Sequence, residues 1–239
     1  MIFYRRWAPI KAITFDLDDT LYDNHPFIQL AEREQFQFMH QHFPTSQSIE
    51  KHQWHQLRQD VISESPSYAG DMIKLRRAVL RKGLALSGLV GDELNDAVER
   101  VYQHFYHHRS NFEVRSEVVQ VLEALAERYP LVAITNGNVD LSRVGIEPYF
   151  SLALHASAEQ PRKPSPFMFE SAKSHLNLPS NEILHVGDNL KKDVWAALNC
   201  GFRAGWYADN RTMHLPRERT ALLPDIAFSA FDELVDLLC

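Results

Sequence analysis

An open α/β fold, in which helices cover both faces of a parallel sheet and a helical region interrupts the chain after the first strand, is the fold class that the sequence predicts. In the second half of the chain, short apolar segments typical of strands alternate with longer amphipathic segments. In the first half, one strand-like segment at residues 10–17 precedes a long, mostly helical region, and the next convincing strand is Leu131–Thr135. Strands separated by helices of this length imply parallel crossovers, which place helices on both faces of the sheet.

The first strand and the helical region follow from local patterns. Residues 10–17 are rich in β-branched and aromatic side chains, as in a short buried strand. A helix is expected over residues 27–43, because Pro26 favours a helix start and an apolar stripe follows it. Apolar residues at helical spacing predict further helices over 49–61, 72–84 and 94–105, with Gly83 near the end of the third.

The second half of the chain follows an alternating order. A helix over residues 118–125 is closed by Pro130, and a polar turn with a short helix is expected after the strand Leu131–Thr135. Further strands are expected at Leu152–His155, 183–186, 204–207 and Ile226–Phe228. Helices are expected between them over 166–177 and 194–199.

Length and charge narrow the class of protein. A chain of 239 residues can hold one substantial core and a smaller companion domain. The net charge is −6 without a basic patch or stripe, so we expect no nucleic-acid partner. No apolar run approaches the roughly 18–20 residues that cross a bilayer, so we expect no membrane partner.

The N-terminal segment and the cysteines favour a cytoplasmic protein. Lys11 and Asp16 interrupt the apolar stretch near the N-terminus, and no small-residue cleavage site follows, which is unlike a signal peptide. Two cysteines, Cys200 and Cys239, do not make a disulfide framework. We therefore expect a cytoplasmic location, as a monomer or a homodimer.

Four polar clusters fall at or just past the expected strand ends. They are residues 16–20 (Asp-Leu-Asp-Asp-Thr), 135–137 (Thr-Asn-Gly), 162–166 (Arg-Lys-Pro-Ser-Pro) and 187–193 (Gly-Asp-Asn-Leu-Lys-Lys-Asp). Each cluster alone would be typical of an ordinary turn. Because ligands in open α/β sheets bind at the carboxyl ends of the strands, the four together indicate one functional site.

The acidic residues of these clusters suggest a metal ion. Asp16, Asp18, Asp188 and Asp193 would bring several negative charges into one crevice, where they cannot all stay ionised without compensation. A hard divalent cation supplies that compensation, and a set of carboxylates, carbonyls and waters suits Mg²⁺.

The remaining polar residues suggest a phosphate beside the metal. Lys163 adds one positive charge, and Thr135 offers a hydroxyl. The backbone amides of Asn136 and Gly137, expected at the start of a following helix, would form an anion seat.

In order, the four clusters resemble the four motifs of the haloacid dehalogenase superfamily of hydrolases. The first motif, Asp-Leu-Asp-Asp-Thr-Leu at residues 16–21, is highly specific, and the resemblance extends from residue 10 to about 205. The helical region lies where the C1 cap of that family is inserted. The resemblance therefore implies a Rossmann-like catalytic core over residues 1–23 and 112–239 and a helical cap domain over residues 24–111.

The resemblance also implies a role for each motif residue. Asp16 is the expected nucleophile and Asp18 the general acid/base. Thr135, Asn136 and Lys163 are expected to hold the transferring phosphoryl group. Asp16, the backbone carbonyl of Asp18, and Asp188 are expected to bind Mg²⁺, the implied cofactor, while Asp193 supports a metal-bound water.

Elementary chemistry supports these roles. A carboxylate pressed against a charge-neutralised phosphorus can displace the leaving alcohol and form an acyl phosphate, which splits one hard hydrolysis into two easier steps. Asp18 lies two residues after Asp16, near enough to protonate the leaving oxygen and later deprotonate the attacking water.

The resemblance also bears on the class of reaction. The family's dehalogenases lack this second aspartate and need no metal, so Asp18 and Asp188 favour a phosphatase for a small phosphate ester. A phosphomutase or other phosphotransferase, and a non-catalytic binding protein, are the alternatives.

Segments 3–5, 14–24, 131–138 and 183–188 resemble one bacterial subgroup of the family. That subgroup is assigned to dephosphorylate 5-amino-6-(5-phospho-D-ribitylamino)uracil in the riboflavin pathway, and such enzymes also accept FMN and sugar phosphates. The resemblance implies this substrate class, and another sugar phosphate or a nucleotide is the alternative. We expect the residues that choose the substrate in the insertion and in the loop at residues 22–25.

A histidine-rich segment at residues 103–108 stands apart from the motifs. The spacing of His104 and His108 puts two imidazoles on one helix face. No acidic or cysteine partner stands beside them in the sequence, and a zinc site needs three or four ligands. The pattern therefore favours an amphipathic helix with polar histidines over a metal site.

Overall fold

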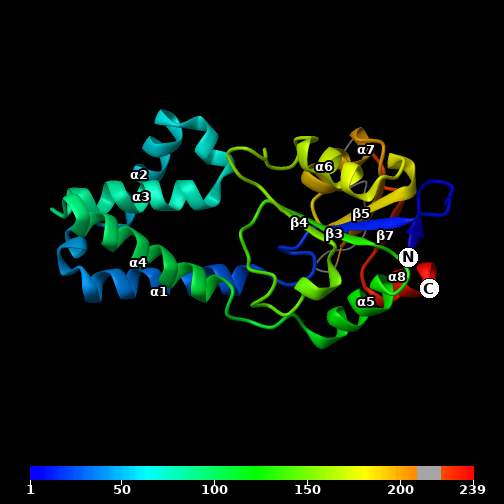
Figure 1. The fold of residues 1–239 in the computed structure, drawn as a ribbon, viewed down its shortest axis with the longest axis horizontal. Helices are drawn as coiled ribbons and strands as arrows, with labels where there is room; N and C mark the ends of the chain where they lie inside the picture. Colours follow the sequence, from blue (N-terminus) through cyan, green and yellow to red (C-terminus); the bar gives the residue numbers. More distant parts are fainter. Residues whose placement is uncertain (209–221) are drawn as a thin grey trace.

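The computed structural model describes residues 1–208 and 222–239, which form a seven-stranded sheet with helices on both faces (Figure 1). The strands are β1 (Ile2–Phe3), β2 (Ala12–Phe15), β3 (Leu131–Thr135), β4 (Leu152–His155), β5 (Ile183–Gly187), β6 (Arg203–Tyr207) and β7 (Ile226–Phe228). Their order in the sheet is β1-β7-β6-β5-β2-β3-β4, and every pair is parallel except β1 with β7. The expected open α/β sheet is thereby confirmed.

The register of the central strands sets the position of the site. Phe15 of β2 pairs with Val186 of β5 on one side and with Ala133 of β3 on the other. All residues of β2, β3 and β5 are buried, as in a parallel sheet covered on both faces. The residues that follow these three strands therefore emerge side by side at one edge of the sheet.

Two apolar layers cover the sheet. On one face, α5 (Ser116–Ala126) and α8 (Asp232–Leu238) pack on buried side chains such as Phe15. On the other face, α6 (Phe167–Leu176) and α7 (Ala196–Asn199) pack on side chains such as Val132. Figure 1 shows these pairs of helices on opposite sides of the sheet.

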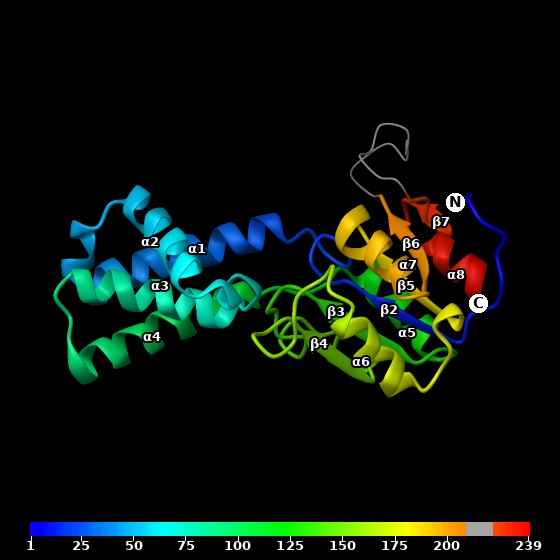
Figure 2. The same cartoon turned by 90° about the horizontal axis from the view of Figure 1, so that it is seen from above.

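The insertion after β2 contains four helices with an apolar core of their own. They are α1 (His25–His42), α2 (Lys51–Glu64), α3 (Met72–Leu86) and α4 (Gly91–Arg109). Figures 1 and 2 show them beside the carboxyl edge of the sheet, away from the helices that cover its faces. Among the described residues, no helix combines the length and the apolar composition that a membrane span requires.

Gly83 lies near the end of α3, as expected, and at a close contact between two helices. The helix continues past it to Leu86. A Cβ atom at Gly83 would lie 2.1 Å from the ring of Trp54, which is buried on α2. Glycine is therefore required here because α2 and α3 approach closely.

Three local expectations were wrong or incomplete. The helix expected soon after β3 is absent from the described residues 136–146, where Asp140 Oδ1 instead accepts bonds from the backbone of Ser142 and Arg143 in a turn. A short 3₁₀ helix, Glu147–Tyr149, follows it.

The helix expected over 194–199 begins earlier, as a π-helix at Leu190–Trp195 that leads into α7. The sequence reasoning also missed β1 and α8, which are short terminal elements.

Candidate active site

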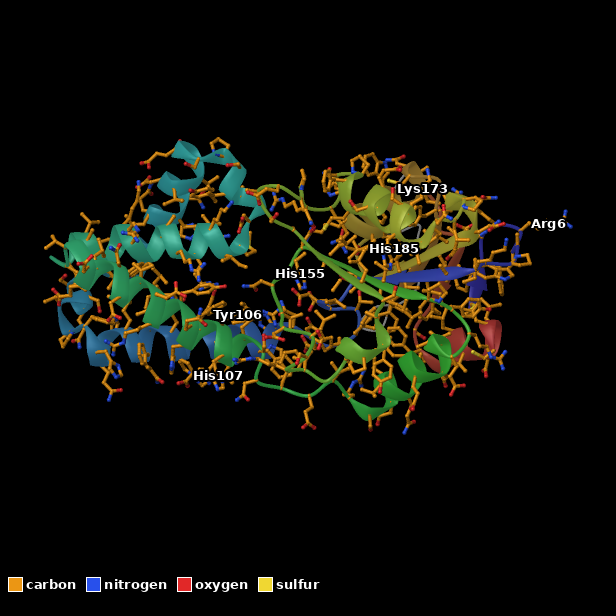
Figure 3. The ribbon with its side chains drawn as sticks, in the orientation of Figure 1. Arg6, Tyr106, His107, His155, Lys173 and His185 are labelled. Atoms are coloured by element: carbon orange, nitrogen blue, oxygen red, sulfur yellow. The ribbon has the colours of Figure 1, made fainter. Side chains whose placement is uncertain are left out.

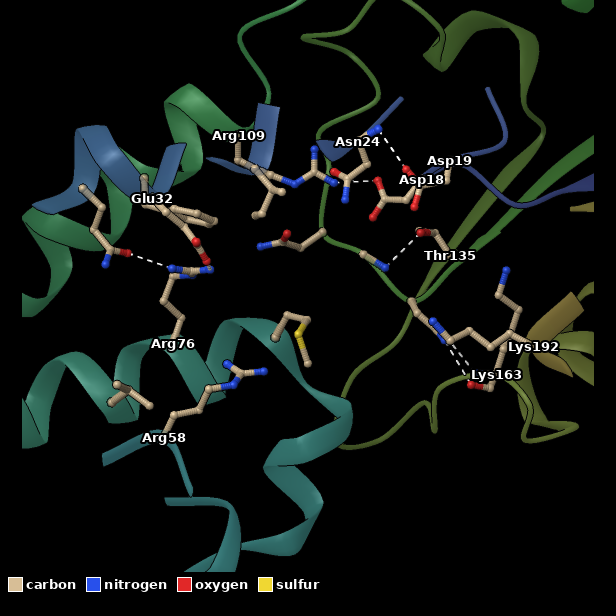
Figure 4. Close-up of a pocket in the computed structure, with 18 of the residues that line it drawn as sticks. Asp18, Asp19, Asn24, Glu32, Arg58, Arg76, Arg109, Thr135, Lys163 and Lys192 are labelled. Carbon is tan, nitrogen blue, oxygen red and sulfur yellow. Dashed lines mark hydrogen bonds and ion pairs between the residues drawn. The ribbon is translucent and has the colours of Figure 1, made fainter. Parts of the chain in front are cut away.

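A cavity of about 660 Å³ lies between the carboxyl edge of the sheet and the helical insertion (Figure 4). All seven site residues expected from the sequence line it: Asp16, Asp18, Thr135, Asn136, Lys163, Asp188 and Asp193. They come from four segments far apart in the chain, and the parallel sheet brings these segments together. Side chains from all four helices of the insertion form the opposite wall.

Lys163 links the two most buried carboxylates of the cavity. Its Nζ lies 2.6 Å from Asp16 Oδ1 and 2.7 Å from Asp193 Oδ1, and it donates to the carbonyl oxygen of Ile134 at 2.7 Å. Burial alone would lower the pKa of Lys163, but the two carboxylates outweigh burial and raise it. The ammonium therefore stays charged between the two acids.

Asp16 is held in an environment that disfavours its charge. Burial, with the negative charge of Asp193, raises the pKa of Asp16 to about 8, although Lys163 opposes the rise. Thr20 Oγ1 contacts its second carboxylate oxygen at 3.4 Å. One lysine does not compensate the acids grouped here, so the site favours an additional cation.

Asp193 is fixed by partners on several sides. His185 Nε2 lies 3.4 Å from Asp193 Oδ1, and the backbone N–H of Asn189 donates to Oδ2 at 2.9 Å. His185 lies in β5 (Figure 3), and its Nδ1 is 2.8 Å from Thr14 Oγ1. Burial would raise the pKa of Asp193, but Lys163 and His185 hold it below its usual range. Asp193 is thus an ionised, immobile carboxylate at the base of the cavity.

Three carboxylates are placed where a divalent cation could bind. Asp16, Asp188 and Asp193 each offer one oxygen, and these oxygens all lie within 4.8 Å of one another. Asp16 and Asp193 are buried, and Asp188 is half-buried. The backbone N–H of Asp188 donates to Thr20 Oγ1 at 3.1 Å, and its carbonyl accepts from Trp206 Nε1 at 2.8 Å. An all-oxygen set of this kind fits Mg²⁺.

The Asp18 carboxylate points toward the insertion and is not part of that group. Arg109 Nη2 and Tyr22 Oη both donate to Asp18 Oδ1, each at 2.6 Å. A Cβ atom at Gly137 would lie 2.3 Å from Asp18 Oδ2, so only glycine leaves room for this carboxylate. Arg109 is the last residue of α4 and is 2% exposed, so an ion pair with one buried partner joins the insertion to the first motif.

Some of the hydrogen-bond donors and acceptors of the expected phosphate-binding residues are already bonded within the protein. Asn136 Nδ2 donates to the carbonyl oxygen of Lys163 at 3.0 Å, and Asn136 Oδ1 accepts from the Lys163 N–H at 2.7 Å. The Asn136 side chain therefore positions the Lys163 loop. Thr135 Oγ1 accepts from the Gly137 N–H at 2.9 Å, which leaves its own O–H to donate.

Two arginines enter the cavity from the insertion, opposite Thr135 and Lys163 (Figure 4). Arg76 of α3 donates to Gln35 Oε1 at 3.0 Å and lies 3.5 Å above the centroid of the Phe105 ring. Arg58 of α2 is half-buried and has no hydrogen-bond or ion-pair partner among residues 1–208 and 222–239. Burial, with repulsion from Arg58, lowers the pKa of Arg76 to about 10, although Glu32 opposes this. This wall of the cavity therefore carries hydrogen-bond donors and positive charge.

Sequence reasoning missed several residues of the site. Arg109, Tyr22 and His185 lie outside the motif residues that carry the chemistry, and their contacts depend on how α4 and β5 pack. Tyr22 carried a weak signal, because it is four residues after Asp18 and within the expected specificity loop. Arg109 carried none, since its partner lies 91 residues away in the chain.

Comparison with known proteins agrees with this geometry. A family model described as haloacid dehalogenase-like hydrolase matches residues 10–201. The 5-amino-6-(5-phospho-D-ribitylamino)uracil phosphatase YigB of Escherichia coli (strain K12) is 35% identical over 238 residues, which cover 100% of both chains. A glyceraldehyde 3-phosphate phosphatase from Pyrococcus abyssi is 27% identical over 208 residues, covering 83% of this chain and 81% of the relative.

A solved structure extends the likeness to three dimensions. The crystal structure of a 2-haloacid dehalogenase from Pseudomonas syringae pv. Tomato DC3000 aligns with a TM-score of 0.90 and 32% sequence identity, covering 96% of this chain and 98% of that one. The chain belongs to the haloacid dehalogenase-like hydrolase family, as its motifs predict.

Proposed function

We propose that this protein is a Mg²⁺-dependent phosphatase of small metabolites that works through an aspartyl-phosphate on Asp16. The broader class is established: the chain is a phosphoric monoester hydrolase, in agreement with its phosphatase relatives. The finer proposal rests mainly on one observation. Asp16, the buried Lys163 and the oxygens of Asp188 and Asp193 meet in one cavity, where a phosphate and a cation would neutralise each other.

In the first step, a carboxylate oxygen of Asp16 attacks phosphorus, and the bond between phosphorus and the leaving oxygen breaks. Lys163 holds Asp16 Oδ1 at 2.6 Å and so orients the carboxylate before substrate arrives. Lys163 itself is kept in place by Asp193 and by the carbonyl of Ile134. Its charge lies where negative charge accumulates on the phosphoryl oxygens.

Asp18 moves the protons in both steps. It donates a proton to the leaving alcohol, then accepts one from the water whose oxygen attacks phosphorus and releases Asp16. Arg109 and Tyr22 fix Asp18 Oδ1, which leaves Oδ2 for this exchange. In this scheme Arg109 and Tyr22 are positioning residues.

The phosphoryl group would be seated by Thr135, Lys163 and the backbone amides that follow Thr135. Because turns rather than a helix follow β3, these amides would act as individual donors without a helix terminus behind them, and the Gly137 N–H would have to leave Thr135 Oγ1 to reach a phosphoryl oxygen. Asn136 contributes through its backbone, since its side chain is bonded to the Lys163 backbone. Asp16, Asp188 and the Asp18 carbonyl would hold Mg²⁺ with Asp193 in support; when bound, the ion supplies charge neutralisation to the phosphoryl oxygens.

Asp18 also favours phosphatase chemistry over dehalogenation. The similar structure from Pseudomonas syringae is named a 2-haloacid dehalogenase. Displacing a halide needs no proton on the leaving group, whereas an alcohol leaving from phosphorus does. An acid side chain held by two buried partners at this position therefore fits phosphate ester cleavage.

We further propose that residues 24–111 act as the cap domain that selects the substrate. Arg58 and Arg76 present donors to the end of the cavity opposite Lys163. These donors suit a substrate with acceptor oxygens far from its phosphate, such as the carbonyls of a pyrimidine or flavin ring. A ribitylaminouracil phosphate or FMN therefore fits the cavity, in line with the name of the YigB relative.

Phosphate release from a panel of phosphorylated metabolites tests the proposal. The panel should contain FMN, the ribitylaminouracil phosphate, sugar phosphates and nucleotides, with a 2-haloacid as the control for dehalogenation. We expect Mg²⁺-dependent phosphate release that chelation abolishes, with the highest kcat/KM for a carbonyl-rich ring phosphate. Halide release without metal, or phosphate transfer to a second hydroxyl instead of water, would overturn it.

A further inference from the structure

A second group of side chains of the kind that can ligate a metal ion lies in the insertion, outside the lining of the cavity. His104 and His108 are on α4, and Glu34 is on α1, which packs along α4. Each residue offers one ligand atom, and the three atoms lie within 4.8 Å of one another. The sequence pattern favoured polar histidines because it showed no acidic partner. Helix packing supplies that partner from far earlier in the chain.

We propose that Glu34, His104 and His108 bind a borderline transition-metal dication such as Zn²⁺. Two imidazoles and one carboxylate are a common set of zinc ligands, and a water molecule can complete a tetrahedron. Mg²⁺ prefers an all-oxygen site and binds imidazole poorly. The two groups of ligands in this protein therefore differ in metal preference: oxygen ligands at the catalytic cavity, and nitrogen with oxygen on the insertion.

The histidine rings are already arranged by packing. The His104 ring stacks on Phe38, with centroids 4.3 Å apart and planes 18° apart, and lies 4.6 Å from the His108 ring. All three candidate ligands are half-buried, so little side-chain freedom remains to be lost on binding.

A metal ion bound by this group would connect two helices of the insertion. α1 carries the chain out of the sheet into the insertion, and α4 returns it. His108 is directly followed by Arg109, which pairs with Asp18. A metal ion held by Glu34 and the two histidines would join α1 to α4 one residue before that ion pair, and so stiffen the connection between insertion and active site.

Calorimetric titration of the full-length, tag-free chain with Zn²⁺, in excess Mg²⁺ to occupy the carboxylate site, tests the proposal. We expect one Zn²⁺ per chain, with affinity at least tenfold weaker in His108→Ala and clearly weaker in Glu34→Gln. His107→Gln is the matched control, because His107 is on the same helix and its Nδ1 contacts Arg143. Figure 3 shows His107 on α4.

Thermal unfolding provides a second readout that does not depend on activity. Zn²⁺ should raise the Tm of the wild type and of His107→Gln equally, and should raise the Tm of Glu34→Gln by less. Equal Zn²⁺ affinity in wild type and His108→Ala would overturn the proposal. So would binding that is lost in Asp188→Asn but kept in both cap variants, since this would place Zn²⁺ at the catalytic carboxylates.

Discussion

Arg109 Nη2 lies 2.6 Å from Asp18 Oδ1, so the last residue of the inserted helices forms a partly buried ion pair with the second aspartate of the first motif. The pKa of Arg109 is raised because Asp18 and Tyr22 together outweigh the cost of its burial. The Asp18 side chain is 23% exposed, so water can solvate it if Arg109 is removed, and the pair stabilises the fold little by itself. The main effect of the pair is to position Asp18, because a residue of the insertion contacts the proposed acid/base residue directly.

Replacing Arg109 should impair Asp18 more than it impairs the fold. In Arg109→Met, we expect kcat for an alkyl phosphate to fall about 10- to 100-fold, a part of what general acid/base catalysis supplies. For p-nitrophenyl phosphate the fall should be smaller, because its leaving group needs no proton. Arg77→Met, which alters an arginine paired with Glu99 outside the cavity, is the control. Equal losses for both substrates would mean that Arg109 serves only the structure.

Metal binding should release protons near neutral pH. Without metal the pKa of Asp16 is raised to about 8, so this carboxyl is mostly protonated at pH 7, whereas a metal ligand must be ionised. We expect roughly one proton released per Mg²⁺ at pH 7, and apparent Mg²⁺ affinity that rises with pH and levels off above about 8. An indicator-dye titration measures the protons. Asp16→Asn should release none, and an affinity independent of pH in the wild type would contradict the assignment.

Arg58 should affect binding of large substrates and leave small ones unchanged. Losing its charged hydrogen bond to a substrate acceptor costs about 1.5–3 kcal/mol, or roughly 10- to 100-fold in kcat/KM. We therefore expect Arg58→Ala to raise KM for the best metabolite while acetyl phosphate hydrolysis stays the same. Arg100→Ala, on the exposed side of α4, is the control. An unchanged KM across the whole panel would remove Arg58 from substrate recognition.

Gly83→Ala should loosen the insertion. The added Cβ would lie 2.1 Å from the Trp54 ring, and overpacking of this kind costs about 1–3 kcal/mol. We expect a Tm several degrees lower by calorimetry. At Gly70, in contrast, a Cβ would meet its nearest neighbour only at 4.0 Å, so Gly70→Ala should be tolerated. Equal Tm values for the two variants would show that the close approach of α2 and α3 carries no energetic weight.

The sequence predicted the sheet well because strand patterns are local, and the motif residues that it singled out all line one cavity. β3 and β4 have the expected bounds, and the motif residues lie at strand ends or in the segments that follow them, which parallel pairing brings to one edge of the sheet. Asp16 and Lys163 are 147 residues apart in the chain, yet the motif pattern identified both.

What could not be predicted depends on packing between helices. Arg109 meets Asp18, and Glu34 meets His104, only because α4 lies along α1 toward the sheet. Gly83 is required by the Trp54 ring of another helix, which the sequence around the glycine cannot indicate. The turn after β3 follows from the Asp140 side chain bonding to backbone that a helix would otherwise use.

The most direct test of the account is to locate the phosphoryl group during turnover, by acid quenching followed by peptide mass spectrometry on wild type and Asp16→Asn. We expect one phosphoryl group on the peptide that contains Asp16 in the wild type. Asp16→Asn should keep its fold, carry no phosphoryl group and lose activity by on the order of a thousandfold or more. A phosphoryl group on another residue, or substantial turnover by Asp16→Asn, would contradict the central claim that Asp16 is the nucleophile.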